Sequence, residues 1–285
     1  MTLFPGVALV TGAASGIGQA TAISFAREGC RKIAIADRNA AGLAETSKAI
    51  EEAASGEIVY IVSQTVDISQ EAQVEGFVHR VVRDLGRIDY AANCAGILSS
   101  NQPSTETSYA DFDKINSVNY RGCWLSSRAE IKQMLLQEPL QSHDGRPGNR
   151  GSIVNIASQL GLVGRPAARK EKHPDPKIPL TITYTNKNPA AYCASKAAVI
   201  SLTQCDAIDY SKHNIRINCV CPGIIDTPMT RPQISSILAP AITIAPMNRP
   251  GTAQEIADAV LFLCSSKATF VQGSAMVVDG GYIIN

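Results

Sequence analysis

The stretch Val7-Ala8-Leu9-Val10-Thr11-Gly12-Ala13-Ala14-Ser15-Gly16-Ile17-Gly18 decides the fold of this chain. Its first four residues are apolar and predict a buried strand, and the residues that follow Gly18 predict a helix. Gly12 allows a tight turn, Gly16 a close approach of a ligand to the backbone, and Gly18 close helix packing. A glycine loop between a strand and the N-terminus of a helix predicts a site for the phosphates of a dinucleotide.

Short apolar strands alternate with amphipathic helices along the rest of the chain. The predicted strands are 7–10, 32–36, 58–62, 88–92, 152–156, 216–220 and 275–278, and the predicted helices are 19–29, 40–54, 70–85, 109–137, 189–210 and one from residue 252. Thr252 and Glu255 have the spacing of a capping box at the start of that last helix. The alternation predicts an α/β fold, with a parallel sheet covered on both faces, in a single domain of residues 1–285.

Composition excludes several classes of protein. The net charge of +1, without a long basic run, gives no support for nucleic-acid or membrane-surface binding. No apolar stretch approaches the roughly 20 residues of a transmembrane helix, and the first basic residue is Arg27, so no signal peptide is recognised. The eight cysteines contain no C-x-x-C pair, and the four histidines have no metal-ligand spacing. We expect a cytoplasmic protein with reduced cysteines and no metal site.

Tyr192 and Lys196 form the clearest catalytic pattern. Four residues apart on a predicted helix, they project from one face. A nearby ammonium lowers the pKa of a phenol from its usual value of about 10, which suits the tyrosine to acid–base chemistry at neutral pH. Taken alone, the pair is also common on an exposed helix without any function. Other residues must therefore support the catalytic interpretation.

Asp37 ends the second strand, 19 residues after Gly18. A carboxylate there accepts hydrogen bonds from both ribose hydroxyls of an adenosine and repels a 2′-phosphate. The position favours NAD, although Arg38 leaves a case for NADP. The alternative is that Asp37 only caps the next helix.

Polar residues also follow the later strands. Asp67, Asn93-Cys94-Ala95-Gly96 and Ser158 come at carboxyl ends of strands, where ligands bind in such sheets. Asn119, near Gly122, lies inside the predicted helix 109–137, where this composition is unfavourable and marks a kink or a functional position.

Together these motifs, with Pro222-Gly223, resemble the classical type of the short-chain dehydrogenase/reductase family over the full length of the chain. The resemblance implies a doubly wound Rossmann sheet of seven strands in the order 3-2-1-4-5-6-7 and a bound nicotinamide cofactor. It implies that Tyr192 transfers a proton, that Ser158 hydrogen-bonds the substrate oxygen, and that Lys196 binds the nicotinamide ribose and lowers the pKa of Tyr192. Asn119 would hold a water molecule in a proton relay.

The same resemblance implies a set of cofactor contacts. Asp67 and Ile68 would bound the adenine, Asn93 would line the ribose side, and the Ile225 backbone and the Thr227 hydroxyl would hold the carboxamide. The complete set is Gly12, Ser15, Gly16, Ile17, Gly18, Asp37, Asp67, Ile68, Asn93, Ala95, Gly96, Tyr192, Lys196, Pro222, Gly223, Ile225 and Thr227.

The implied function is an NAD-dependent oxidoreductase that interconverts a secondary alcohol and a ketone. Two alternatives remain: the same fold used for a non-redox isomerisation or cyclisation, and a non-catalytic dinucleotide-binding sensor. The residues 121–124 and 190–196 resemble those of fungal natural-product reductases, which points to secondary metabolism. We expect a homo-oligomer, a tetramer or a dimer.

Two segments depart from the family or vary within it. Ser158 and Tyr192 are 34 residues apart, much farther than is usual, because of an insertion at about 165–188, in which 182–184 could form a small extra strand. Its prolines exclude it from the sheet, so it must run over the surface beside the reaction centre. We expect a wall or lid of the substrate site, the alternative being an inert excursion or an interface. The apolar substrate-loop region at about 227–248 suggests an apolar substrate.

Overall fold

The computed structural model describes residues 2–98, 102–164, 167–171, 181–185, 189–236 and 238–284. A sheet of seven parallel strands lies at its centre, in the order β11-β8-β5-β4-β1-β2-β3. The strands are β1 (Val7–Thr11), β2 (Lys32–Asp37), β3 (Tyr60–Thr65), β4 (Tyr90–Asn93), β5 (Gly151–Ile156), β8 (Ile215–Pro222) and β11 (Ala275–Val278). Numbered within this sheet alone, their order is 3-2-1-4-5-6-7, which confirms the prediction. The strand order reverses between β1 and β4, which is the switch point where ligands bind.

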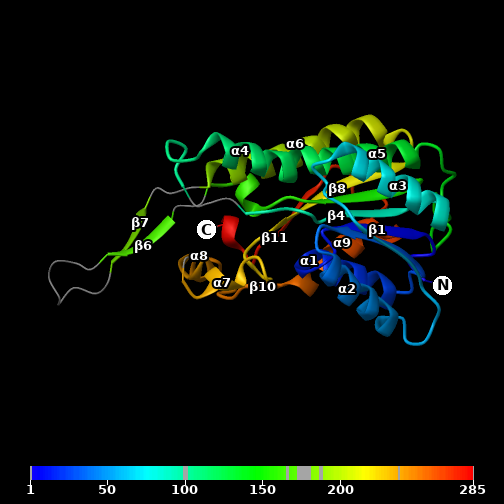
Figure 1. The fold of residues 1–285 in the computed structure, drawn as a ribbon, viewed down its shortest axis with the longest axis horizontal. Helices are drawn as coiled ribbons and strands as arrows, with labels where there is room; N and C mark the ends of the chain where they lie inside the picture. Colours follow the sequence, from blue (N-terminus) through cyan, green and yellow to red (C-terminus); the bar gives the residue numbers. More distant parts are fainter. Residues whose placement is uncertain are drawn as a thin grey trace.

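Helices cover both faces of the sheet (Figure 1). One face carries α1 (Gly16–Arg27), α2 (Ala40–Ala53) and α9 (Ala253–Cys264), and the other carries α3 (Glu71–Leu85), α5 (Cys123–Met134) and α6 (Ala190–Ser211). Alternate residues of a strand point to opposite faces. In β1, Ala8 accordingly belongs to the apolar cluster that contains Phe25 of α1, and Leu9 to the one that contains Phe77 of α3. Two apolar cores therefore fix the sheet between its two helical layers.

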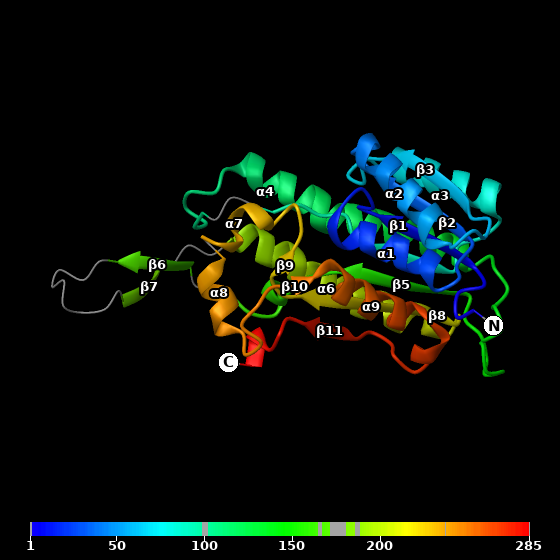
Figure 2. The same ribbon diagram turned by 90° about the horizontal axis from the view of Figure 1, so that it is seen from below.

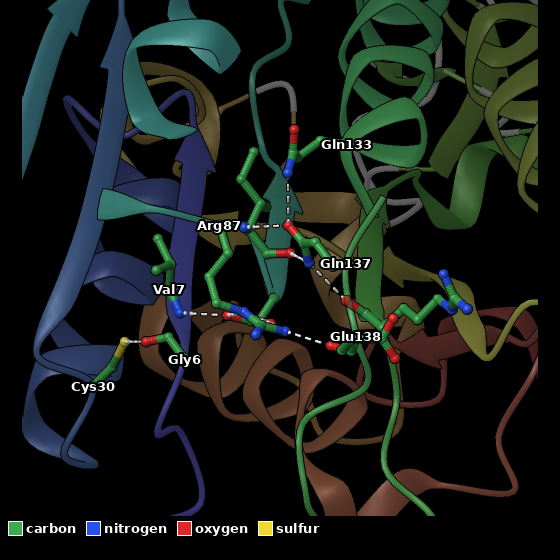
Figure 3. Close-up of polar contacts among 10 residues, drawn as sticks. Gly6, Val7, Cys30, Arg87, Gln133, Gln137 and Glu138 are labelled. Atoms are coloured by element: carbon green, nitrogen blue, oxygen red, sulfur yellow. Dashed lines mark hydrogen bonds and ion pairs between the residues drawn. The ribbon is translucent and has the colours of Figure 1, made fainter. Parts of the chain in front are cut away.

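Two strands begin later than the sequence predicts. β3 starts at Tyr60, which pairs with Lys32, while Ile58 is 76% exposed and lies before the strand. β4 starts at Tyr90, because the backbone N–H and C=O of Ile88 are both hydrogen-bonded to the side-chain amide of Gln137 (Figure 3). Ile88 N donates to Gln137 Oε1 at 2.8 Å, and Gln137 Nε2 donates to Ile88 O at 2.8 Å. These contacts fasten the amino end of β4, on the edge of the sheet away from the switch point.

The helix predicted at 109–137 is three consecutive segments. α4 (Tyr109–Asn116) is followed by a π-helical segment, Ser117–Gly122, and then by α5. A Cβ at Gly122 would lie 2.7 Å from Ile68 Cδ1, so a glycine is needed for this close approach. The expectation that Asn119 marks an irregular position is confirmed, since it lies within the π-helical segment.

The carboxyl-terminal half adds small elements near the switch point. They are α7 (Arg231–Ile234), α8 (Ala239–Ile244), the paired strands β9 (Ile225–Asp226) and β10 (Gly251–Thr252), and the 3-10 turns Gln159–Gly161 and Tyr282–Ile284. A further 3-10 turn, Ser266–Ala268, lies at the opposite edge of the sheet, beside the amino ends of β4 and β5. The capping box of α9 is confirmed: Glu255 N donates to Thr252 Oγ1 at 3.2 Å, and Thr252 N donates to Glu255 Oε2 at 2.7 Å.

The insertion contains an antiparallel hairpin of β6 (Ala167–Glu171) and β7 (Thr181–Thr185). The extra strand expected at 182–184 is therefore confirmed, and it pairs with 168–170. Figures 1 and 2 show the two strands extending from the end of the domain that carries α7 and α8. Residues 165–166, 172–180 and 186–188 of the insertion lie outside the described residues.

All eight cysteines are free thiols, and five of them are buried. Within the described ranges, no group of histidine, cysteine, aspartate and glutamate side chains is arranged to hold a metal ion. No helix in the described part of the chain is long and apolar enough to cross a membrane.

Candidate active site

A cleft with a volume of about 320 Å³ lies at the switch point, along the carboxyl ends of the strands. It contains every site residue predicted from the sequence except Asn93 and Asn119. The predicted residues that line it are Gly12, Ser15, Gly16, Ile17, Gly18, Asp37, Asp67, Ile68, Ala95, Gly96, Ser158, Tyr192, Lys196, Pro222, Gly223, Ile225 and Thr227.

The glycine loop forms one wall of this cleft, where β1 passes into α1. Gly12 and Gly16 have φ angles of +68° and +55°, in the left-handed region that favours glycine. A Cβ at Gly18 would lie 2.1 Å from the carbonyl oxygen of Gly12. Ser15 is the N-cap of α1 and makes no capping hydrogen bond with its side chain. The first backbone N–H groups of α1 therefore border an open cradle that fits a phosphate group.

Asp37 lies at the end of β2, beside the glycine loop. Its Oδ2 accepts a hydrogen bond from Ala14 N at 3.1 Å, and its Oδ1 accepts one from Asn39 N at 3.0 Å. The N-cap of α2 is Asn39, whose side chain accepts from Gly42 N, so the alternative that Asp37 caps this helix is wrong. The carboxylate is instead held at the cleft, next to the loop that it was expected to serve.

Arg38 and Asp67 lie at the same end of the cleft. Arg38 Nη1 is 3.9 Å from Asp67 Oδ2, and the Arg38 side chain is largely exposed. Burial raises the pKa of Asp67, but hydrogen bonds from Ser69 and the charge of Arg38 outweigh it and hold the pKa below its usual range. Asp67 is therefore an anion at neutral pH, partly neutralised by the arginine.

Tyr192 and Lys196 lie one turn apart near the start of α6, at the other end of the cleft. Lys196 Nζ is 5.9 Å from the centroid of the Tyr192 ring and donates a hydrogen bond to Ile156 O at 2.7 Å. Burial lowers the pKa of Lys196, while neighbouring thiols, chiefly that of Cys123, act in the opposite direction. The lysine is thus fixed at the end of β5, with its nitrogen close to the phenol.

Ser158 is held by a turn that packs on the same helix. It caps the 3-10 turn Gln159–Gly161, since its Oγ accepts a hydrogen bond from Leu160 N at 3.1 Å. A Cβ at Gly161 would lie 2.8 Å from the carbonyl carbon of Lys196, so the turn rests directly on the backbone of α6. This contact brings Ser158 to Tyr192 and Lys196 across 34 residues of chain.

Asn119 lies behind the cleft and is buried. Its Oδ1 accepts a hydrogen bond from Ile97 N at 2.8 Å, and its Nδ2 donates to Ile97 O at 3.0 Å and to Ser195 Oγ at 3.3 Å. The side chain therefore joins the loop after β4 to α6, beside Lys196. A Cβ at Gly96 would lie 3.3 Å from Asn119 Oδ1 and 3.5 Å from Lys196 Nζ, which shows how close these groups are.

Asn93 points into the protein interior, so its side chain does not line the cleft. Its Nδ2 donates to Glu130 Oε2 at 2.9 Å and to Asn155 Oδ1 at 3.1 Å. Glu130 is fully buried, burial raises its pKa to about 7, and its Oε1 has no hydrogen-bond partner among the described residues. Ser127 Oγ and Thr203 Oγ1 complete this network through Asn155. Asn93 positions the end of β4, while its neighbours Ala95 and Gly96 border the cleft.

Several residues of the site were missed from the sequence. The cleft is also lined by Val66, Ile97, Leu98, Val118, Ile156 and Ala157, and by Cys94, Met229 and Thr230, which belong to the predicted segments 93–96 and 227–248. Most are apolar and carry no motif. Glu130 could have been found, because Cys123, Ser127, Glu130 and Met134 follow helical spacing and are all buried.

A doubly wound sheet with a glycine loop at its switch point is a Rossmann-type α/β protein. Residues 6–169 match the family described as short chain dehydrogenase, and residues 180–283 match the one described as enoyl-(acyl carrier protein) reductase. The chain belongs to the short-chain dehydrogenase/reductase family, an oxidoreductase family that binds a nicotinamide dinucleotide, which confirms the resemblance read from the sequence.

Individual relatives cover nearly the whole chain. Short-chain dehydrogenase fogB of Aspergillus ruber is 37% identical over 283 residues, which are 97% of this chain and 96% of the relative. The 2-(R)-hydroxypropyl-CoM dehydrogenase of Xanthobacter autotrophicus is 35% identical over 97% of this chain and 98% of its own length. The crystal structure of levodione reductase is 32% identical, with a TM-score of 0.81 over 98% of each chain.

Proposed function

We propose that the protein is an NAD-dependent oxidoreductase that interconverts a secondary alcohol and a ketone. The observation that carries this proposal is the meeting of Ser158, Tyr192 and Lys196 in one cleft whose other end is the glycine loop. The lining of this cleft supports the binding of a nicotinamide dinucleotide, because the glycine loop would hold its phosphates and Asp37 its adenosine ribose. The bound cofactor supplies hydride transfer at its nicotinamide ring.

The protein residues supply position, charge and a proton. In the direction of reduction, Tyr192 donates its hydroxyl proton to the substrate oxygen, and in oxidation it accepts the proton back. Ser158 donates a hydrogen bond to the same oxygen and orients it. The ammonium of Lys196 stabilises the phenolate that remains on Tyr192. We keep the role of Asn119 in a proton relay through water as part of the proposal.

The test of this function is an absorbance assay of nicotinamide reduction and oxidation with a panel of secondary alcohols and ketones. Turnover of at least one pair in both directions is the expected result. Binding of NAD without turnover of any pair would favour the non-catalytic sensor, and a change in the substrate without a net redox change would favour an isomerase or cyclase. The presence of Ser158, Tyr192 and Lys196 together argues against the sensor.

Asp37 is expected to determine the preference for NAD. Its carboxylate would accept the ribose hydroxyls of NAD and repel the 2′-phosphate of NADP. Replacing Asp37 with Ala should lower the ratio of kcat/KM with NAD to kcat/KM with NADP roughly tenfold, which corresponds to about 1.4 kcal/mol. Steady-state kinetics with both cofactors measures the ratio.

Arg38→Ala is the matched control for that experiment. Arg38 is adjacent and positively charged, so it would attract the 2′-phosphate of NADP. Its removal should therefore raise the NAD:NADP ratio of kcat/KM instead of lowering it. A wild-type enzyme that prefers NADP, or an Asp37→Ala variant with an unchanged ratio, would contradict the assignment.

We propose that the insertion at about 165–188 contributes a wall of the substrate site. Its ends follow Ser158 and precede Tyr192, and its described strands extend from the end of the domain that carries α7 and α8 (Figure 2). Replacing 165–188 with a short glycine–serine linker should leave the unfolding temperature and the affinity for NAD intact while raising KM or changing the substrate range. An unchanged KM and substrate range would show that the insertion does not touch the substrate.

The proposal includes an apolar small-molecule substrate, a place in secondary metabolism and a homo-oligomeric state, a tetramer or a dimer. Exposed aromatic residues on α4 and α5, including Tyr109 and Trp124, are consistent with an interface. Light scattering at several protein concentrations measures the oligomeric state.

A further inference from the structure

Gln159 contains a buried polar atom that no residue of the described chain satisfies. It follows Ser158 directly, and its carbonyl oxygen accepts hydrogen bonds from Leu162 N at 2.9 Å and from Val163 N at 3.1 Å, which fix its backbone. The residue is only 1% exposed, yet Oε1 has no hydrogen-bond partner. Burying an unpaired amide oxygen costs about 1–3 kcal/mol, and such atoms are rare in folded proteins. A partner from outside the chain would remove this cost.

Gln159 stands between two cavities beside the catalytic residues. One has a volume of about 80 Å³ and is also lined by Ser158 and Tyr192. The other has a volume of about 320 Å³ and is lined mainly by apolar residues, among them Ile224, Ala241, Ile242, Ala245, Met247 and Tyr282. Gln159, Gly223 and Ile224 border both. A substrate whose reacting group lies at Tyr192 would therefore extend past the Gln159 amide, and the apolar rest of the substrate would enter the larger cavity.

The charged groups around the larger cavity are already paired. Arg249 Nη2 is 2.6 Å from Glu255 Oε1, and the Asp279 carboxylate accepts hydrogen bonds from Gly281 N at 2.8 Å and Ile283 N at 2.9 Å. An anionic ligand group would therefore find no free positive charge among these three residues. The partner that best fits an unpaired amide oxygen here is a neutral donor such as a hydroxyl group.

We propose that Gln159 Oε1 accepts a hydrogen bond from a hydroxyl group of the substrate other than the one that reacts. The substrate class is then a hydroxyketone, or the corresponding diol, with an apolar remainder. This inference rests on the proposed alcohol–ketone oxidoreduction and adds a specificity-determining residue to it. An analogue that lacks the hydroxyl leaves Oε1 unpaired and is discriminated against for that reason.

The experiment compares cyclohexanone with the hydroxycyclohexanones that carry the hydroxyl at each ring position, and with their methyl ethers. In the wild type, one hydroxyketone should have a kcat/KM roughly tenfold above that of cyclohexanone, mainly through KM; this factor corresponds to about 1.4 kcal/mol, which is within the range of one net hydrogen bond. The methyl ether cannot donate and should lose this advantage. In Gln159→Leu the ratio between hydroxyketone and cyclohexanone should fall to about one.

Gln204→Leu is the matched control, because Gln204 is exposed on α6 and borders neither cavity, so it should keep the wild-type ratio. The unfolding temperature of Gln159→Leu should not fall, since removing an unpaired buried polar group is neutral or stabilising. An unchanged ratio in Gln159→Leu, no preference of the wild type for any hydroxyketone, or a strongly lowered unfolding temperature would overturn the inference.

Calorimetric binding of the corresponding diols and cyclohexanol to the enzyme with NADH, a complex in which an alcohol has no oxidant and cannot react, repeats the comparison without turnover. The expected result is the same roughly tenfold preference, lost in Gln159→Leu. If the wild type binds the diols selectively through Gln159 but turns over none of them, the oxidoreductase proposal fails while the Gln159 contact holds. If the wild type and Gln159→Leu each bind the diol and cyclohexanol with equal affinity, the proposed contact between Gln159 and the hydroxyl group is wrong, whatever the kinetic assays show.

Discussion

Replacing Tyr192 with phenylalanine is expected to lower kcat by roughly 10²–10⁴-fold, the scale of a lost acid–base group. Phenylalanine keeps the ring beside Lys196 but removes the hydroxyl that would exchange a proton with the substrate oxygen. The affinity for NAD should change little, since the glycine loop and Asp37 lie at the other end of the cleft. Steady-state turnover and a fluorescence titration with NADH measure the two quantities.

Tyr210→Phe provides the control on the same helix. Tyr210 packs against the apolar cluster on the α3, α5 and α6 face and does not line the cleft, so its variant should keep kcat close to that of the wild type. Near-normal turnover by Tyr192→Phe would contradict the proposed role of Tyr192 as the proton donor. An equal loss of NAD affinity in Tyr192→Phe would instead indicate damage to the cleft.

Glu130→Gln is expected to remove a large dependence of stability on pH. The pKa of Glu130 is about 7 in the folded chain against 4.5 for an ordinary glutamate, so the unfolded chain releases this proton first as the pH rises. Glu130 should therefore lower the free energy of unfolding of the wild type by roughly 3 kcal/mol as the pH rises from 4.5 to about 7, and should cause no further change above pH 7. Glutamine stays neutral throughout, so the variant should be more stable than the wild type above neutral pH and similar to it at pH near 4.5.

Urea unfolding at a series of pH values measures this difference. Glu138→Gln is the control, because Glu138 lies on the surface and its replacement should leave the pH dependence as in the wild type. A Glu130→Gln protein with the same pH dependence as the wild type would mean that the buried carboxyl does not hold its proton. A loss of stability at all pH values would mean that the glutamine amide does not fit the Asn93 network.

Much of the fold could be predicted because each strand and helix has a local signal. The apolar run of β1, the glycines after it and the capping box of Thr252 depend on residues close together in the sequence, and the structure has all three as predicted. The order of the seven strands came from the family resemblance. It could not be derived from propensity, since parallel strands pair over long distances in the chain.

The parts that could not be predicted depend on contacts between distant residues. The start of β4 is set by the side chain of Gln137, and the direction of the Asn93 side chain is set by Glu130 and Asn155. A motif names the residue type at such a position but not the face to which its side chain turns. The unpaired oxygen of Gln159 is likewise visible only when every neighbouring donor has been placed.

The contact of Gly161 with the backbone of α6 affects which parts of this sequence can change in length. Because Ser158 is tied to Lys196 by that contact, the intervening chain is not needed to align the two. Doubling the length of a flexible loop adds only about 0.6 kcal/mol to the entropy of closing it. The segment between Gly164 and Pro189 is thus a place at which evolution or an engineer can lengthen or exchange sequence while Ser158 and Lys196 keep their relative positions.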